Sequence, residues 1–355
     1  MLESYLKSSP KQLFLLCYCY RESLAGEVGL QFGKTLMMRR TLRRIPLCAF
    51  GVLAMLAAPF LHAADAKPRV TVKYAPKSAA KSSVHKYTPV AAQRGGTGLV
   101  AAGTPNLKSA SALVIDLEDG STLYGKNTQI VTPIASITKL MTSMVVLDAN
   151  LPAGETIYID AADYDSIKHT SSRLRMGTGL PRRDMLHLAL MSSENRAAAA
   201  LGRAYPGGSE AFVAAMNRKA VELGMWKSRF VDATGLSSEN VSTAEDLAKM
   251  VKAAYEYPLI REFTTTAAHE VATVAGRSLQ FRNSNGLVKN PIWEIGLSKT
   301  GYISEAGRCL VMQAKIAARP VIIVLLDSWG RQTRIGDANR IKRWLETHVG
   351  RKPMG

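Results

Sequence analysis

The sequence predicts an α/β (α+β) fold in which the two ends of one domain supply a sheet and the middle supplies helices. β-prone runs flank Asp119-Gly120 near the start of the domain, and two more lie near its end, from Arg308 to Lys315 and from Pro320 to Leu326. Between these runs, apolar residues recur at helical spacing. With 355 residues, of which 47% are apolar, the chain is long enough to bury a substantial core.

The domain is expected to begin near Ser109 with a β-hairpin. In the segment SALVIDLEDGSTLYGKN, Asp-Gly between two β-prone runs is a tight-turn signal. The period then changes, because Thr132-Pro133 is typical of a helix cap followed by the first helical residue. The apolar residues behind it are spaced as on one helical face: Ile134, Ile137, Leu140, Met141, Met144 and Leu147.

Later elements follow the same logic. Helices are predicted from Asp184 to Leu201, from Glu210 to Leu223 and, at the end, from Asp337 to His348. Lys299-Thr300-Gly301 follows Ile295 and Leu297 in a strand, where its glycine is expected to let a ligand approach the backbone closely. The strands at 308–315 and 320–326 are expected to be neighbours.

Three segments precede the predicted folded domain, which spans 109–355. Residues 37–66 are predicted to be a signal peptide, with arginines, an apolar stretch and cleavage after Ala63 or Ala66; a retained anchor is the weaker alternative. Residues 1–36 are an extended leader or remain untranslated, because Met37 and Met38 stand directly before the arginines. Residues 67–108 carry basic but no acidic side chains and are predicted to be a flexible tether.

The chain is strongly basic, with a formal net charge of +18. Residues 1–66 hold 8 basic and 4 acidic side chains, so the remainder keeps +14. Such charge fits nucleic acid, an anionic membrane or an acidic polymer and does not choose among them. Of the four cysteines only Cys309 lies in the predicted domain, where we expect a small buried apolar side chain.

Ser136-Ile137-Thr138-Lys139 is the first candidate for chemistry. The S-x-x-K spacing puts hydroxyl and amine on one helical face, where a lysine with a lowered pKa can take the serine proton. The same spacing occurs at four other serines, which all fall in the leader or the tether: Ser4, Ser8, Ser78 and Ser83. Only Ser136 therefore lies where a fold can hold the pair.

Two further motifs follow in order. Ser193-Glu194-Asn195 comes after an apolar run and is predicted to mark a helix end or an inter-helix turn. A second S-x-N spans Ser238 to Asn240, and for either one an ordinary turn is the alternative. Lys299-Thr300-Gly301 completes the series. The conjunction S-x-x-K, S-x-N and K-T-G is the pattern of β-lactamases and penicillin-binding proteins.

With these motifs, residues 109–349 resemble the low-molecular-mass penicillin-binding proteins that are serine D-alanyl-D-alanine peptidases, and in particular the endopeptidases called penicillin-binding protein seven. The similar segments are PIASITKLMT, LALMSSENRAAAA, DATGLSSENVSTAEDLAKM and LSKTGYISEAGRCLV. The resemblance implies a transpeptidase fold shared with β-lactamases, with an antiparallel sheet from both chain ends and a helical insert.

The resemblance also implies roles for single residues. Ser136 is expected to be the nucleophile, Lys139 its general base and Ser193 the proton relay, while Asn195 holds Lys139 and the substrate amide. Lys299, Thr300 and Gly301 are expected to bind a carboxylate of substrate or penicillin, and the N–H groups of Ser136 and Tyr302 to form the oxyanion hole. The sequence departs from many relatives at Glu194, where they have aspartate, and at Ile303, where a hydroxyl residue is common.

Other functions fit the sequence less well. A class A β-lactamase needs an E-x-x-L-N pattern, a Ser-His-Asp hydrolase a G-x-S-x-G elbow and a zinc peptidase H-E-x-x-H, and none of these occurs. A basic secreted binding module explains the charge but not the motifs. No metal, cofactor or nucleic acid is expected. The expected partners are peptidoglycan cross-linked peptides, β-lactams as covalent inhibitors and, peripherally, an anionic wall or membrane in the periplasm. The resemblance favours endopeptidase activity on peptidoglycan cross-links, and the motifs also fit the alternative, D-alanyl-D-alanine carboxypeptidase activity on pentapeptide stems.

Overall fold

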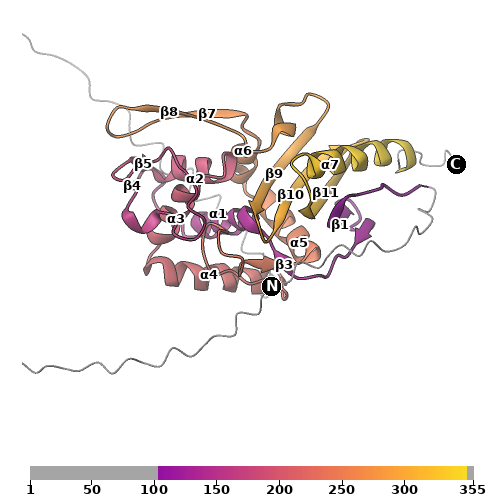
Figure 1. The fold of residues 1–355 in the computed structure, drawn as a ribbon, viewed down its shortest axis with the longest axis horizontal. Helices are drawn as coiled ribbons and strands as arrows, with labels where there is room; N and C mark the ends of the chain where they lie inside the picture. The colour runs from indigo at the N-terminus through magenta and orange to yellow at the C-terminus, as the bar shows by residue number, and fades with distance from the viewer. Residues whose placement is uncertain (1–102, 350–355) are drawn as a thin grey trace, which may run out of the picture. The chain divides into compact units, whose positions relative to one another are not determined.

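The computed structural model describes residues 103–349 and contains a five-stranded antiparallel sheet in the order β2-β1-β11-β10-β9. The hairpin at the start and the three strands at the end form one sheet, as expected, with β9 at its edge (Figure 1). The strands are β1 Ser109–Asp116, β2 Thr122–Lys126, β9 Glu294–Ile303, β10 Gly307–Ile316 and β11 Arg319–Ser328.

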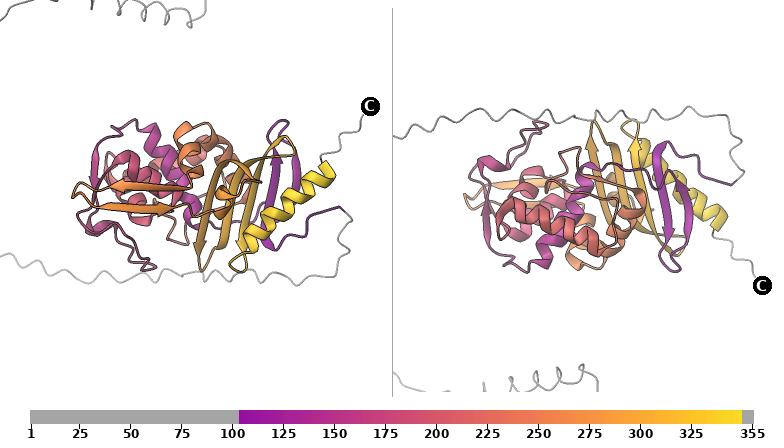
Figure 2. Two further views of the ribbon diagram at one scale, coloured as in Figure 1. Left: turned by 90° about the horizontal axis from the view of Figure 1, so that it is seen from above. Right: turned by 90° about the horizontal axis from the view of Figure 1, so that it is seen from below.

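Side chains alternate between two cores because a strand points successive residues to opposite faces. Leu113, Val311 and Val324 face a large core shared with the helices α1 to α6, while Val114, Leu310 and Ile323 face a smaller core under α7. Figure 2 shows α7 lying across the strands, with the other helices gathered on the far side. The predicted α/β fold is confirmed.

The helical part lies between β2 and β9 in the chain. Its helices are α1 Thr138–Asp148, α2 Arg182–Met191, α3 Asn195–Arg203, α4 Gly208–Glu222, α5 Ala244–Tyr255 and α6 Pro258–Thr265, and α7 Thr333–Trp344 follows the sheet. Short 3₁₀ turns cover Ala135–Ile137, Ala161–Asp163 and Gly286–Lys289, and a π-helical turn covers Leu345–Val349. Three small pairs complete the fold: β3 Thr132–Pro133 with β6 Val241–Ser242, β4 Thr156–Tyr158 with β5 Gly179–Pro181, and β7 Ala268–Ala272 with β8 Ser278–Arg282.

Thr132-Pro133 does not begin the first helix, and here the prediction from cap chemistry was wrong. The two residues pair with β6 as a short strand, and a 3₁₀ turn at Ala135–Ile137 separates them from α1. The stretch from Asp184 to Leu201 likewise contains two helices instead of one, α2 and α3, because the chain turns at Ser193. In both places the helical spacing of apolar residues continues across the position where the helix is interrupted, so the spacing alone does not reveal the interruption.

The fold begins slightly before Ser109. Leu107 is buried under α7, and the Asp337 carboxylate accepts hydrogen bonds from the N–H groups of Lys108 and Ser109. Residues 103–108 therefore do not all belong to the tether predicted at 67–108. The rest of that tether, the leader at 1–36 and the signal peptide at 37–66 lie outside the described residues.

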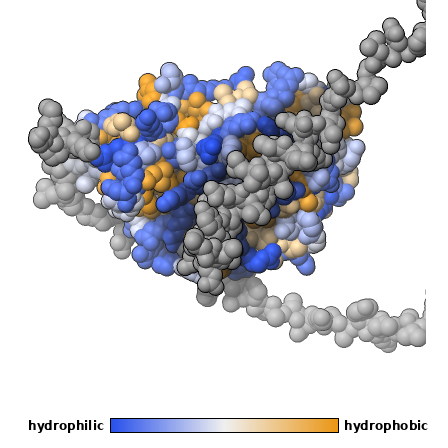
Figure 3. Space-filling model, turned by 180° about the vertical axis from the view of Figure 1, so that it is seen from behind, coloured by the Kyte–Doolittle hydropathy of each residue, from blue (hydrophilic) through white to orange (hydrophobic). Residues whose placement is uncertain are grey.

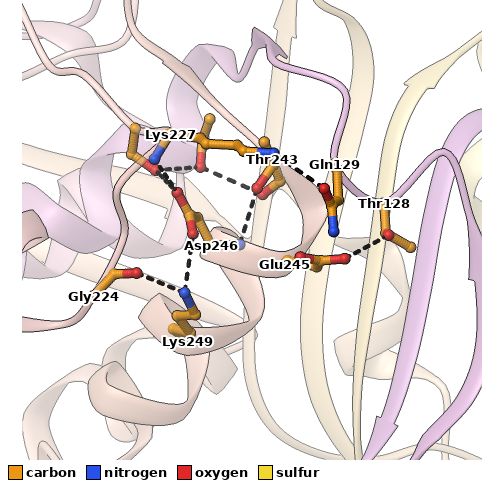
Figure 4. Close-up of polar contacts among 10 residues, drawn as sticks. Thr128, Gln129, Gly224, Lys227, Thr243, Glu245, Asp246 and Lys249 are labelled. Carbon is orange, nitrogen blue, oxygen red and sulfur yellow. Dashed lines mark hydrogen bonds and ion pairs between the residues drawn. The ribbon is translucent and has the colours of Figure 1, made fainter.

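The start of α5 is tied to its neighbours by a polar cluster (Figure 4). Thr243 caps the helix by accepting from the N–H of Asp246. The Asp246 carboxylate accepts in turn from the N–H of Lys227 and pairs with Lys249. Glu245 accepts a hydrogen bond from Thr128, which follows β2. These contacts tie the start of α5 to the segment after β2 and to the loop at Lys227.

None of the described helices is long and apolar enough to cross a membrane. The face drawn in Figure 3 is mostly hydrophilic, with scattered apolar residues over the described part. Cys309 is buried and unpaired, and burial raises the pKa of its thiol to about 11. It is an inert core residue, as the sequence predicted.

Candidate active site

Ser136 lies in the 3₁₀ turn before α1 and is the exception in a buried stretch. All residues from Thr132 to Val146 are buried except Ser136, which is partly exposed. The preceding Ala135 adopts a left-handed conformation, with φ of 50°. A non-glycine residue in that region carries backbone strain of about 1–3 kcal/mol and needs support from its surroundings. The turn thus presents a single hydroxyl to solvent from an otherwise closed core.

Two glycines provide that support by close packing. A Cβ at Gly235 would lie 2.0 Å from the carbonyl oxygen of Ala135, and Gly235 also has a φ of 80°. A Cβ at Gly301 on β9 would lie 2.9 Å from the carbonyl oxygen of Ile134 and 3.2 Å from the backbone nitrogen of Ser136. Gly301 is therefore needed because the turn that carries Ser136 packs closely against β9. The sequence had suggested a different reason, the close approach of a ligand.

Lys139, on the first turn of α1, directs its amine at Ser136. Its Nζ lies 2.9 Å from Ser136 Oγ, 2.7 Å from Asn195 Oδ1 and 2.6 Å from the carbonyl oxygen of Thr234. The amide oxygen and the carbonyl oxygen can only accept hydrogen bonds, whereas the hydroxyl can also donate. A neutral amine has two N–H groups and one lone pair. This arrangement therefore uses both N–H groups on the pure acceptors and leaves the lone pair for the Ser136 hydroxyl.

The surroundings of Lys139 favour that neutral form. Its side chain is fully buried, and burial lowers the pKa of the amine to about 7, against the opposing pull of the carboxylates of Asp232, Glu194 and Asp165. Desolvation disfavours a charged amine, while nearby negative charge favours it. The balance holds the pKa close to neutral pH, which is where a general base is most effective.

Ser193 and Asn195 come from the turn between α2 and α3. Ser193 has a φ of 62°, and this left-handed residue lets the chain leave α2 and start α3 two residues later. Asn195 accepts from Lys139 through Oδ1 and donates through Nδ2 to Thr170 Oγ1 at 3.0 Å. The inter-helix turn predicted from the S-x-N motif is present, and it brings both side chains to the two lysines.

Lys299 approaches from the sheet edge. Its side chain is buried on β9, and Nζ donates to Ser193 Oγ at 2.8 Å. Burial, followed by the nearby positive charges of Lys139 and Arg334, lowers the pKa of Lys299 well below its usual value. Thr300 Oγ1 donates to Ser284 Oγ at 2.7 Å, and Tyr302 is exposed beside it. The structure thus forms two hydrogen-bonded groups at this site, Ser136–Lys139–Asn195 and Ser193–Lys299, and the turn between α2 and α3 supplies one residue to each. Thr300, Gly301 and Tyr302 follow Lys299 along β9.

The comparisons with known proteins agree with this geometry. The family model for D-alanyl-D-alanine carboxypeptidases, Peptidase S11, matches residues 99–330. The chain belongs to this family. The peptidase family and the penicillin-binding-protein fold predicted from the sequence are both confirmed, and the chain is a serine-type D-alanyl-D-alanine peptidase.

Individual relatives are similar over most of the domain. A D-alanyl-D-alanine endopeptidase of Pseudomonas aeruginosa is 52% identical over 242 residues, which are 68% of this chain and 78% of that protein. A D-alanyl-D-alanine endopeptidase of Escherichia coli K12 is 48% identical over 248 residues, 69% of this chain and 80% of the other. The crystal structure of the Streptomyces K15 DD-transpeptidase matches with a TM-score of 0.64 at 29% identity, covering 68% of this chain and 98% of that one.

In this S11 peptidase a loop at residues 232–240 also borders the active site, and only its end, Ser238 to Asn240, carries a recognisable motif. Residues 232–240 lie against both the nucleophile turn and Lys139, through Gly235 and the Thr234 carbonyl. The second S-x-N motif ends this loop. Its Asn240 is buried and accepts a hydrogen bond from the N–H of Val231. Asn240 therefore has a structural role, in agreement with the alternative prediction of an ordinary turn. The loop falls inside a segment that resembles the family, but no single residue of it signals chemistry.

A second loop borders the site on the side of Thr170. The Asp165 carboxylate accepts from the N–H groups of Ile167, Lys168 and Thr170 and so shapes this loop. Lys168 forms an ion pair with Glu305 in the turn between β9 and β10. The helical part and the sheet are thus bridged at the active site of this S11 domain.

Neither a Ser-His-Asp triad nor a zinc site is assembled among residues 103–349. His269 stacks on His187 and lies 3.4 Å from Asp184, and burial lowers the pKa of His187 to about 3. No group of three His, Cys, Asp or Glu side chains in this range could hold a metal ion.

Proposed function

We propose that this protein is a serine D-alanyl-D-alanine endopeptidase that hydrolyses peptide cross-links of peptidoglycan through an acyl-enzyme on Ser136. The observation that carries the proposal is the environment of Lys139. A buried amine with a pKa near 7 stands 2.9 Å from a partly exposed serine hydroxyl, and its other two neighbours can only accept hydrogen bonds. That geometry prepares one proton transfer, from Ser136 to Lys139.

In the acylation step, Lys139 Nζ takes the proton of Ser136 while Ser136 Oγ attacks the D-alanyl carbonyl carbon. The new C–O bond gives a tetrahedral oxyanion, which the N–H groups of Ser136 and Tyr302 bind. When the C–N bond breaks, the leaving amine takes the proton that Lys139 accepted, with Ser193, which accepts a hydrogen bond from Lys299, as the relay. Water then attacks the ester, releases the peptide acid and restores the Ser136 hydroxyl, so that one water is consumed for each amide bond.

Lys299 and Thr300 bind a carboxylate of the substrate in this account. Burial and neighbouring cations lower the pKa of Lys299, and an arriving carboxylate reverses that shift because opposite charge stabilises the ammonium form. The same two side chains bind the carboxylate of a β-lactam. Because β9 is the edge of the sheet, its outer backbone groups are available to an extended peptide, which lies along the strand beside Ser136.

The endopeptidase activity is favoured over the carboxypeptidase activity by the names of the two relatives at 52% and 48% identity. The two activities differ only in the leaving amine, which is a cross-linked side-chain amine in the first case and free D-alanine in the second. We expect the purified protein to convert cross-linked muropeptide dimers to monomers, with the gain of one water, faster than it trims pentapeptide monomers. Mass spectrometry of the two digests measures both reactions.

Ser136→Ala is the control for that digest and should leave both substrates intact. Release of free alanine from pentapeptides, with dimers unchanged, would replace the endopeptidase proposal by the carboxypeptidase alternative. Dimer cleavage by the Ser136→Ala protein would remove the serine mechanism altogether.

We also propose that the protein is exported by a cleaved signal peptide at 37–66 to the periplasm. Its basic tether then holds it loosely to an anionic wall or membrane. The net charge of +14 after residue 66 supports the electrostatic part. The exported protein should begin at Ala64 or Lys67, as read by N-terminal sequencing. Washing with about 1 M salt, where the Debye length is roughly 3 Å, should release it from envelope fragments. Retention after that wash, together with an uncleaved N-terminus, would indicate a membrane anchor instead.

A further inference from the structure

We propose that Asp232 is a positioning residue, which sets the place and the protonation of Lys139 by ordering the Thr234 carbonyl and by its own charge. The inference rests on the proposed role of Lys139 as general base. The hydrogen bonds of its carboxylate all come from residues of its own loop, so it acts on Ser136 and Lys139 only through that loop and through its charge.

The Asp232 carboxylate is the anchor of its loop. Oδ1 accepts from the N–H and the hydroxyl of Thr234, both at 2.6 Å, and from the N–H of Gly235 at 2.7 Å. Oδ2 accepts from the N–H of Ser237 at 3.1 Å and from Asn240 Nδ2 at 2.6 Å. Burial alone would raise the pKa of Asp232, but the bonds from Thr234 and Asn240 outweigh it and lower the pKa, so the group stays ionised.

The loop ordered in this way contacts α1 at successive turns. The Thr234 carbonyl accepts from Lys139 Nζ at 2.6 Å, and the neighbouring carbonyl of Ala233 accepts from Thr142 Oγ1 at 2.7 Å. Gly235 lies against the Ala135 carbonyl in the nucleophile turn. One carboxylate therefore fixes, through two adjacent peptide groups, the distance between the Ser136 turn and the Lys139 amine.

The charge of Asp232 also acts on Lys139 directly. Among the charges that favour the ammonium form, Asp232 contributes most, followed by Glu194 on the α2–α3 turn and Asp165 on the loop before β5. Lys299 on β9 is the cation that faces Lys139. Without Asp232, burial acts against a weaker opposing charge, and the pKa of Lys139 falls further. A lower pKa makes the amine a weaker base.

The test is the pH dependence of acylation by a chromogenic β-lactam, measured on the full exported chain. In the wild-type protein the rate should fall below about pH 7, because Lys139 becomes protonated. In Asp232→Asn this acid limb should move down by about 1 pH unit, as expected when one neighbouring charge is lost. The plateau rate should fall at least about tenfold, because the amide NH2 of asparagine cannot accept from Ser237 N–H and Asn240 Nδ2, so the loop that carries the Thr234 carbonyl is displaced.

Asp163→Asn is the matched control. Asp163 is also a buried carboxylate, paired with Arg203, but it is absent from the charges that act on Lys139. Its substitution should change thermal stability and leave the acid limb at the wild-type pH. Asp232→Glu keeps the charge and displaces it by one methylene. The acid limb of the Asp232→Glu profile should stay at the wild-type pH, while the plateau rate of acylation falls. If Asp232→Asn does not fold, Asp232→Glu provides the test.

An acid limb that moves equally in Asp163→Asn and Asp232→Asn would overturn the inference, and so would a wild-type plateau in Asp232→Glu. Failure of the underlying function has a different signature: the wild-type protein itself would lack an acid limb near pH 7, or Ser136→Ala would still be acylated.

Discussion

Replacement of Lys139 by arginine is expected to lower the rate of acylation by a β-lactam by about 10² to 10⁴, the usual contribution of a general base. Arginine keeps a cation at this position but cannot release its proton near neutral pH. The wild-type amine, in contrast, has a pKa of about 7 and offers a lone pair to Ser136. The loss should appear in the stopped-flow rate of acylation, with folding checked by thermal melting because the Lys139 side chain is fully buried.

Lys299→Arg is the matched variant, since it makes the same chemical change at the other buried lysine of the site. It keeps the positive charge that we assign to carboxylate binding, so it should retain more activity than Lys139→Arg. If both substitutions proved equally mild, neither lysine would be the base. If Lys299→Arg were the more damaging, the roles of base and electrostatic partner would be exchanged.

The sheet could be predicted from the sequence because its signals are local. The Asp-Gly turn and the apolar runs near the end appear where β1, β2, β10 and β11 are found. The turn at Ser193 could be predicted from the S-x-N motif that follows an apolar run, although not from the left-handed conformation that Ser193 adopts. The short strand at Thr132-Pro133 was missed because its partner, β6, is distant in sequence.

The candidate site was predicted to a similar extent. Ser136, Lys139, Ser193, Asn195 and Lys299 were expected from motifs, and the structure pairs Lys139 with Ser136 and Asn195, and Lys299 with Ser193. The support around them could not be predicted. Gly235 matters because of the Ala135 carbonyl a hundred residues earlier in the chain, and Asp232 matters because five donors of its own loop converge on it. A single sequence does not reveal which distant backbone a residue will meet.

Covalent labelling with benzylpenicillin should produce the largest effect of all, because removal of the nucleophile leaves no atom to acylate. The strained lactam carbonyl replaces the D-alanyl carbonyl, and ring opening on Ser136 Oγ retains every atom of the drug. Ser143→Ala is the control on the same helix. Ser143 is buried and donates to the carbonyl of Lys139, so its loss leaves the reacting atoms in place.

The decisive measurement is the mass of the penicillin-treated protein and of its tryptic peptides, in the wild type, Ser136→Ala and Ser143→Ala. The account predicts one added penicilloyl group on the peptide that contains Ser136, in the wild type and in Ser143→Ala, and no added mass in Ser136→Ala. An adduct of the same yield in Ser136→Ala, or one located on another serine of the wild type, would contradict it.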